Sequence, residues 1–269
     1  MLKQRIITGV IIAPIALACV FLLPPLEFSL FVGAVLVVAG WEWANLGGLA
    51  GPYRFVYAAC LALSIAGIAL LPPVPVMLAG MVWWLLAIIL VVRFPALEPV
   101  WGRQPVILLL GFWILLPGWV ALSSLKQMPD SAFLICLLFF LIWGADIGAY
   151  FSGRALGKRK LAPRVSPGKS WAGFYGGLLT ALVIAVAMSL WLGRPDLGSA
   201  EGAFYLLAAG IVAMISVLGD LSISMFKRHR DIKDSSQLLP GHGGFLDRID
   251  SLLSASPAFV LYLSWANWA

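Results

Sequence analysis

The sequence predicts an all-α integral membrane protein that crosses the bilayer several times. Of its 269 residues, 62% are hydrophobic and only 11% are charged, whereas soluble domains carry about 25% charged residues. Apolar segments of the length that spans a bilayer follow one another along the chain. A backbone surrounded by lipid must satisfy its own hydrogen bonds, so each segment is expected to be a helix.

Nine apolar segments come close to the ~20 residues that a membrane-spanning helix needs. The first follows Lys3 and Arg5 and resembles a signal peptide, but its apolar run continues to Leu23, which favours a retained helix. Only Pro72-Pro73 separates the third from the fourth, so these two could be wrongly divided. The predicted spans are 6–23, 28–46, 55–71, 75–92, 105–122, 131–151, 171–192, 202–226 and 251–268.

The basic residues indicate which ends of these helices face the cytoplasm. With a cytoplasmic N-terminus and alternating sides, 16 of the 18 lysines and arginines fall on cytoplasmic segments, and only Lys126 and Arg194 fall outside. The positive-inside rule therefore favours nine spans with the N-terminus inside and the C-terminus outside. Two basic loops, 152–170 and 227–250, are then cytoplasmic, where soluble nucleotides and anionic lipid headgroups are available.

Functional polarity is uneven along the chain. Residues 1–140 are interpreted as a transmembrane scaffold, and residues 141–269 as the catalytic half. We find no internal repeat, so a transporter built from inverted repeats gains no support. Most of the twelve tryptophans lie near predicted span ends and are assigned to an interfacial aromatic belt. Trp43, Trp83 and Trp84 are among them.

Asp146 is the first residue that indicates chemistry, because it lies near the cytoplasmic end of the sixth predicted span. An ionisable residue at such a position costs at least ~2.5 kcal/mol and needs a partner or water. Function as a metal ligand is favoured, while a structural ion pair with an arginine remains the alternative. Gly144 and Gly148 are expected to let a ligand approach closely.

A second feature is the segment Ser166-Pro-Gly-Lys169-Ser170, which ends the first basic loop. We expect a helix to start here, and helix N-termini bind phosphate. The lysine adds a positive charge and the serines add hydroxyls, although the spacing is not that of a P-loop. The other basic residues of this loop, Lys158 among them, could equally serve only to fix topology.

A third feature is a polar stripe in the eighth predicted span. Asp220, Ser224 and Lys227 are spaced i, i+4 and i+7, so they share one face of a helix. A lipid-facing helix could not tolerate a carboxylate, a hydroxyl and an ammonium on one face. The stripe, with Arg228 after it, is therefore predicted to face a polar site.

The fourth feature lies just before the last span. Asp247 and Asp250 share a helical face, and together with Asp220 they could bind Mg²⁺, which prefers hard oxygen ligands. The alternative is that they only stabilise the N-terminus of a helix. Gly243 and Gly244 would permit an anion-binding loop.

His242, in the same glycine loop, could act as a general base. A phosphate nucleophile is already ionised near neutral pH and needs no base, so we prefer a phosphate hydrogen-bond donor or a loop organiser. His229 is expected to be solvated.

The segment from Ser224 to Asp250 resembles the signature of the phosphatidate cytidylyltransferase (CDP-diacylglycerol synthase) family. The matching residues are Ser224, Lys227-Arg228, Lys233-Asp234, His242-Gly243-Gly244 and Asp247-Arg248-Ile249-Asp250. Upstream, Gly144-Ala-Asp146, Ser166-Pro-Gly-Lys169-Ser170 and Gly219-Asp220 also look like the family. The resemblance covers about 141–250, and the first 140 residues match only as apolar spans.

The resemblance implies an inner-membrane enzyme that joins CTP and phosphatidate into CDP-diacylglycerol and pyrophosphate with Mg²⁺, as a homodimer in many members. Residues and resemblance together predict three sets of site residues. The predicted catalytic residues are Lys227, Arg228, His242 and Asp247. The predicted substrate-binding residues are Ser166, Lys169, Ser170, Ser224, Lys233, Gly243, Gly244 and Arg248. The predicted metal ligands are Asp146, Asp220, Asp247 and Asp250.

Two other functions fit some of these features. A CTP-dependent lipid or polyprenol kinase would transfer the γ-phosphoryl group to an alcohol and release CDP, and it would need a base. An anion or phospholipid transporter would use the cationic residues without cleaving a bond, but it gives no reason for aspartates beside the cations.

Overall fold

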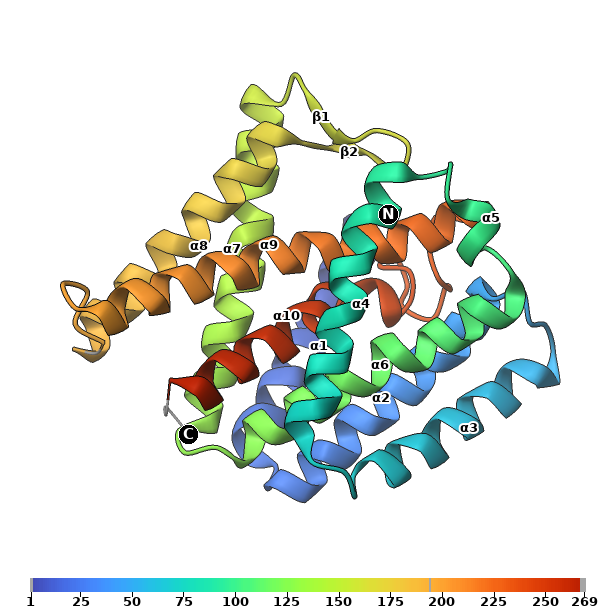
Figure 1. The fold of residues 1–269 in the computed structure, drawn as a ribbon, viewed down its shortest axis with the longest axis horizontal. Helices are drawn as coiled ribbons and strands as arrows, with labels where there is room; N and C mark the ends of the chain where they lie inside the picture. The colour runs from blue at the N-terminus through green and yellow to red at the C-terminus, as the bar shows by residue number, and fades with distance from the viewer. Residues whose placement is uncertain (1, 194, 267–269) are drawn as a thin grey trace.

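A computed structural model describes residues 2–193 and 195–266, which form ten α-helices and one two-stranded antiparallel sheet (Figure 1). The helices are α1 (Leu2–Leu22), α2 (Pro25–Leu46), α3 (Pro52–Ile68), α4 (Pro73–Arg93), α5 (Glu98–Trp101), α6 (Gln104–Gln127), α7 (Ser131–Leu156), α8 (Trp171–Leu192), α9 (Ala200–His229) and α10 (Leu246–Trp265). The strands are β1 (Lys160–Ala162) and β2 (Ser166–Ser170).

Each predicted apolar segment coincides with one long helix. The division at Pro72-Pro73 is confirmed, because α3 ends at Ile68 and α4 begins at Pro73. Within the described residues, six helices are long and apolar enough to cross a membrane, namely α2, α4, α6, α7, α8 and α9. The helical membrane-protein class is confirmed, whereas the count of nine spans stays a prediction. Arg194 and residues 267–268 of the last predicted span lie outside the described residues.

The hairpin β1–β2 differs from the expected all-helical arrangement. Ser166–Ser170 forms a strand, with Ser166 opposite Ala162 and Ser170 opposite Lys160. Pro167 favours an extended backbone at Ser166, the residue before it. Helix α8 begins at Trp171, as the predicted span 171–192 has it, and the Ser170 hydroxyl caps it by accepting the Gly173 N–H at 3.1 Å.

Three of the tryptophans assigned to an interfacial belt lie in the core instead. Trp43, Trp83 and Trp84 are almost completely buried. The Phe226 ring lies 4.9 Å from Trp43, 6.1 Å from Trp83 and 5.0 Å from Trp101, centroid to centroid. The belt assignment is therefore wrong for these side chains, because position along a span does not reveal which face of the helix is covered by protein.

Gly144 and Gly148 serve helix packing, so the expectation that they let a ligand approach is wrong. A Cβ at Gly148 would lie 2.8 Å from the Gly176 carbonyl oxygen of α8, and one at Gly144 would meet the Ile184 side chain. Small residues let the backbones of neighbouring helices approach closely. Figure 1 shows the resulting pair, in which α7 and α8 lie side by side below the hairpin that connects them.

Loops that are far apart in sequence meet at one end of the molecule. Figure 1 shows β1–β2 and α5 along one edge, with the last turn of α10 at the opposite edge. Side-chain contacts join the predicted cytoplasmic loop 227–250 to α1, α2, α5 and the hairpin. They are Thr8 Oγ1 to Pro240 O at 2.9 Å, Asn45 Nδ2 to Ser235 O at 3.4 Å, Arg230 Nε to Asn45 O at 3.3 Å, Arg228 Nε to Val165 O at 3.1 Å, and His229 with Glu98.

Phe226→Ala is expected to destabilise the protein by about 3–5 kcal/mol, because it removes a fully buried ring that packs on three tryptophans. Thermal unfolding in detergent, followed by size-exclusion profiles after heating, measures the change. Phe151→Ala, at an exposed phenylalanine of α7, is the matched control. Equal thermal stability of the two variants would contradict a core role for Phe226.

Candidate active site

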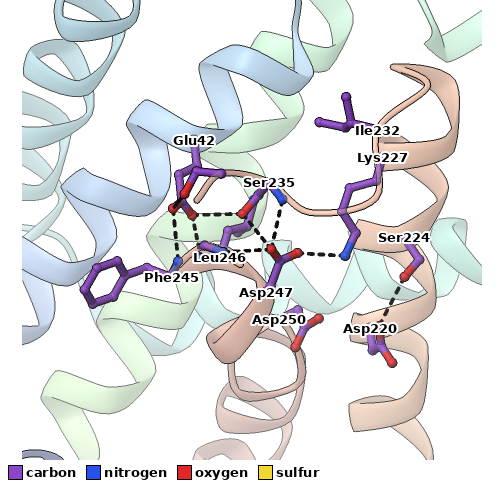
Figure 2. Close-up of polar contacts among 12 residues, drawn as sticks. Glu42, Asp220, Ser224, Lys227, Ile232, Ser235, Phe245, Leu246, Asp247 and Asp250 are labelled. Atoms are coloured by element: carbon purple, nitrogen blue, oxygen red, sulfur yellow. Dashed lines mark hydrogen bonds and ion pairs between the residues drawn. The ribbon is translucent and has the colours of Figure 1, made fainter. Parts of the chain in front are cut away.

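The polar stripe of α9 forms one wall of the site. Ser224 Oγ donates to Asp220 Oδ1 at 3.2 Å, as expected for residues four apart on one helical face. Lys227 extends from the next turn of the same face (Figure 2). Ser224 and Lys227 are buried and Asp220 is half-buried. The three side chains therefore share a face of α9 that is largely covered by protein, while their part in a substrate site stays a prediction.

Two ion pairs join this stripe to other elements. Lys169 of β2 reaches Asp220 with Nζ–Oδ2 at 2.6 Å, and Lys227 reaches Asp247 of α10 with Nζ–Oδ1 at 2.7 Å. Figure 2 shows the second pair bridging α9 and the first turn of α10. The hairpin, α9 and α10 thus meet through alternating carboxylates and ammonium groups.

The Asp247 carboxylate is held by further donors. Its Oδ2 accepts the backbone N–H groups of Ser235 at 2.9 Å and Gly244 at 3.0 Å, and the Ser235 hydroxyl lies 3.0 Å away. Asp247 precedes the apolar part of α10. Burial alone would raise the pKa of this carboxyl, but Lys227 and the N–H donors outweigh burial and hold the pKa below its usual value. Asp247 is therefore ionised at neutral pH.

The loop before α10 is shaped by its glycines. Leu239 donates to Gly243 O and His242 donates to Leu239 O, both at 2.8 Å, which closes a tight turn. Gly241 and Gly243 have φ values of 77° and 82°, where side chains are strained. A Cβ at Gly243 would also lie 2.7 Å from Asp247 Oδ2. The glycines therefore let this loop close around the Asp247 carboxylate.

His242 stands at the tip of this turn. Its Nδ1 is buried and has no hydrogen-bond partner among the described residues. A Cβ placed on Gly9 of α1 would lie 4.0 Å from the imidazole, so the start of α1 lies beside this ring. A buried nitrogen without a partner is costly, which favours the predicted role as a donor to a bound group.

Asp146 and Asp250 complete the predicted carboxylate set. Asp250 is buried, and its Oδ1 accepts the Ser251 N–H at 2.8 Å. Asp250 lies within electrostatic reach of Asp220, and Asp146 lies within reach of Asp220, Lys169 and Arg248. In residues 2–193 and 195–266, no three carboxylate, imidazole or thiolate groups are grouped so that they could hold a metal ion.

The donor chemistry of this set nevertheless fits Mg²⁺. Clustered carboxylates repel one another, and a divalent cation relieves that repulsion. Proteins often bind Mg²⁺ through one or two carboxylates, with phosphates and waters as the remaining ligands. Asp220 lies within electrostatic reach of both Asp250 and Asp146, so it is common to either pair.

The remaining predicted residues lie around this centre. Arg228 Nε donates to Val165 O at 3.1 Å, so its guanidinium fastens the hairpin loop to the end of α9. Lys233 and Arg248 are exposed, and Ser166 is half-buried in β2. Ser170 is buried as the cap of α8. Substrate contacts by these side chains stay predictions.

Glu42 is a site residue that the sequence analysis missed. This α2 residue is 0% exposed, and its carboxylate accepts hydrogen bonds from the loop that carries the glycines. Figure 2 shows it directly behind Asp247, on the side away from Lys227. In the sequence, Glu42 is visible only as a single carboxylate near the end of an apolar span of the scaffold half. Such a residue does not indicate a site unless it is known what that face of the helix contacts.

The expectation that His229 is solvated is wrong. Its imidazole pairs with Glu98 and lies 5.1 Å from the Trp101 ring, centroid to centroid. An open cavity of about 610 Å³ lies beside this pair, lined also by Pro95 and Arg103. Because His229 follows Lys227 by two residues, the cavity lies on the opposite face of α9 from the polar stripe.

Comparison with known proteins shows the family of this chain. A model of the cytidylyltransferase family matches residues 3–266. The chain is 51% identical over 271 residues to a phosphatidate cytidylyltransferase of Pseudomonas aeruginosa. This alignment covers 100% of the chain and 99% of the relative. It is 41% identical over 283 residues to the enzyme of the same name from Haemophilus influenzae, covering 97% and 98%. The chain therefore belongs to the cytidylyltransferase family.

Gly244→Ala is expected to lower activity at least tenfold, because the added methyl group would collide with the Ser235 hydroxyl and the Glu42 carboxylate behind Asp247. Overpacking of this kind costs about 1–3 kcal/mol. Turnover per folded molecule is the measurement. Gly67→Ala in α3, where the methyl group meets open space, is the control. Full activity of Gly244→Ala would contradict the tight packing of the loop.

Proposed function

We propose that this chain transfers the cytidylyl group of CTP to phosphatidate, giving CDP-diacylglycerol and pyrophosphate for phospholipid synthesis. The full-length similarity to two phosphatidate cytidylyltransferases supports the activity. The observation that carries the mechanism is the alternation of lysines and aspartates at the meeting point of β2, α9 and α10. Two polyanions must meet in this reaction, so their repulsion is the main barrier to approach.

The lysines and aspartates act by exchanging partners. Without substrate, Lys169 and Lys227 neutralise Asp220 and Asp247. When the phosphates of CTP and phosphatidate enter, the two ammonium groups turn toward them and lower their repulsion. A phosphate oxygen of phosphatidate then attacks the α-phosphorus of CTP in line, and pyrophosphate leaves. The lipid phosphate is already ionised, so His242 serves as a hydrogen-bond donor rather than as a base.

Mg²⁺ fits the carboxylates that this exchange releases. The exchange releases Asp220 and Asp247, which are the first proposed ligands, with Asp250 and Asp146 as the others. When bound, the ion neutralises developing negative charge on the transferred group and on the leaving pyrophosphate. The chain itself supplies the ligands and holds the two lysines on either side of them.

The site faces the cytoplasm in this proposal, and the protein lies in the inner membrane with nine spans and a cytoplasmic N-terminus. The contact between the loops 152–170 and 227–250, and those of the second loop with Thr8, Asn45 and Glu98, support a common side for these parts of the chain. Relatives from bacteria support the inner membrane. A homodimer remains an expectation from the family resemblance.

Product analysis tests the proposed function. Purified protein in detergent receives CTP, phosphatidate and Mg²⁺, and pyrophosphate release is measured together with the lipid product. Equal amounts of pyrophosphate and cytidine-bearing lipid are expected. CDP in place of pyrophosphate would favour the lipid kinase, and neither product from folded protein would favour the transporter.

Lys227→Met is expected to lower turnover by 30-fold or more, because a cation at a developing phosphoryl charge contributes about 2–4 kcal/mol by analogy with oxyanion donors. It also leaves Asp247 buried without its cation, which destabilises the fold. The double variant Lys227→Met/Asp247→Asn removes both charges, so stability should recover while activity stays low. Lys158→Met, at an exposed lysine of the first basic loop, is the control. Recovery of activity in the double variant would contradict a direct role for Lys227.

A further inference from the structure

Glu42 is an acidic residue of the scaffold half that lies against the active-site loop and is 0% exposed. Its four hydrogen-bond donors come from the middle of the loop between α9 and α10 and from the start of α10 (Figure 2). They are Ser236 Oγ at 2.5 Å and Phe245 N at 3.0 Å to Oε1, and Leu246 N at 2.7 Å and Ser235 Oγ at 3.1 Å to Oε2. One carboxylate in α2 therefore fastens a loop about 200 residues further along the chain.

The burial of this carboxylate requires those donors. Taking an ionised carboxylate out of water costs several kcal/mol unless hydrogen bonds replace the lost water. Within the described part of the chain Glu42 has no ion-pair partner. Arg54 lies within electrostatic reach, but its guanidinium lies 3.4 Å above the Trp41 ring. The loop and the end of α10 are thus the groups that keep Glu42 satisfied, and Glu42 in turn fixes them.

Glu42 also supplies the N-terminal cap that α10 lacks in its own sequence. Phe245, at the cap position, makes no side-chain cap hydrogen bond. The first N–H groups of a helix have no partner within the helix, and a negative charge there is stabilising. The Glu42 carboxylate accepts from Phe245 and Leu246, the first such groups of α10. This cap ends one residue before Asp247.

The glycine at position 244 fits this reading. A Cβ there would collide with the Glu42 carboxylate and with the Ser235 hydroxyl. The second glycine of the His-Gly-Gly segment is therefore needed because a buried carboxylate from α2 occupies the space beside it.

Ser235 links Glu42 to the reacting side of the loop. Its hydroxyl lies 3.1 Å from Glu42 Oε2 and 3.0 Å from Asp247 Oδ2, and its backbone N–H also donates to Asp247 Oδ2. A hydroxyl has one proton to donate, so it serves either carboxylate by rotation. A shift of Glu42 would therefore move Ser235, and with it the carboxylate that holds Lys227.

We infer that Glu42 is a positioning residue for the transfer reaction, acting from α2 through the cap of α10 and through Ser235 on the Asp247–Lys227 pair. This role rests on the proposed function, since Glu42 itself touches no predicted substrate atom. Because Glu42 belongs to α2, this role gives the N-terminal half of the chain a part in the active site.

Hydrogen exchange and kinetics of Glu42→Gln test the inference. The amide keeps the size of the side chain but has one acceptor oxygen, so an NH₂ group would face an N–H or hydroxyl donor. Exchange at 235–247 should speed at least tenfold in the protein without substrate. Turnover per folded molecule should fall at least tenfold while the KM for CTP changes less than threefold. Glu42→Asp, which keeps the charge, should recover part of both. Glu27→Gln, at an exposed glutamate of the same helix, should match the wild type.

The other outcomes overturn the inference. Unchanged exchange at 235–247 would show that Glu42 does not hold the loop. Faster exchange with turnover within twofold of the wild type would show that holding the loop does not matter for the reaction. Uniformly faster exchange over all helices would indicate a general role in stability. If Glu42→Gln does not fold, Ser235→Ala cuts the link to Asp247 and should give the same two effects.

If the wild type makes no CDP-diacylglycerol, the proposed function fails. The exchange at 235–247 would still report whether Glu42 holds the loop, so the two failures are distinguishable.

Discussion

Hydrophobic residues make up 62% of this chain. An ionised carboxylate that is buried among them needs cations or N–H and O–H donors around it, because burial without such partners costs several kcal/mol. The Lys227–Asp247 pair meets this constraint at the centre of the site. It joins α9 to α10, and the loop between them closes over it through Ser235 and Gly244. The hairpin β1–β2 is joined to α9 in the same way, because Lys169 of β2 neutralises Asp220.

The position of the Lys227–Asp247 pair is linked to the packing of the core on another face of α9. Phe226 directly precedes Lys227 and lies about 100° from it around α9, so its ring leaves the helix on a different face, where Trp43, Trp83 and Trp101 enclose it. Helix α9 therefore has a polar face for chemistry and an aromatic face for anchoring, and the second fixes the rotation of the first. Trp43 stands next to Glu42 in the sequence, so α2 contributes to both.

Much of the site could be predicted from sequence, because it depends on short-range spacing. The i, i+4, i+7 stripe of α9 and the glycine loop before α10 are local patterns with local consequences. The strand at Ser166–Ser170, the buried tryptophans and the cap by Glu42 could not be predicted this way. In an apolar helix of a membrane protein, lipid and protein surfaces select similar side chains, so the sequence does not reveal which face meets α9 or α10.

Glu42 and Asp247 hold opposite sides of one loop, yet their surroundings differ in a way that suits different tasks. Glu42 is bonded only to neutral donors of the protein, which no incoming phosphate would attract away. Asp247 shares its charge with a lysine, which a polyanion would attract strongly. The fixed contacts therefore lie on the scaffold side and the exchangeable ones on the substrate side. In the proposed mechanism, this division lets the lysines change partners while the backbone that carries the aspartates stays in place, as electrostatic preorganisation of a transfer reaction requires.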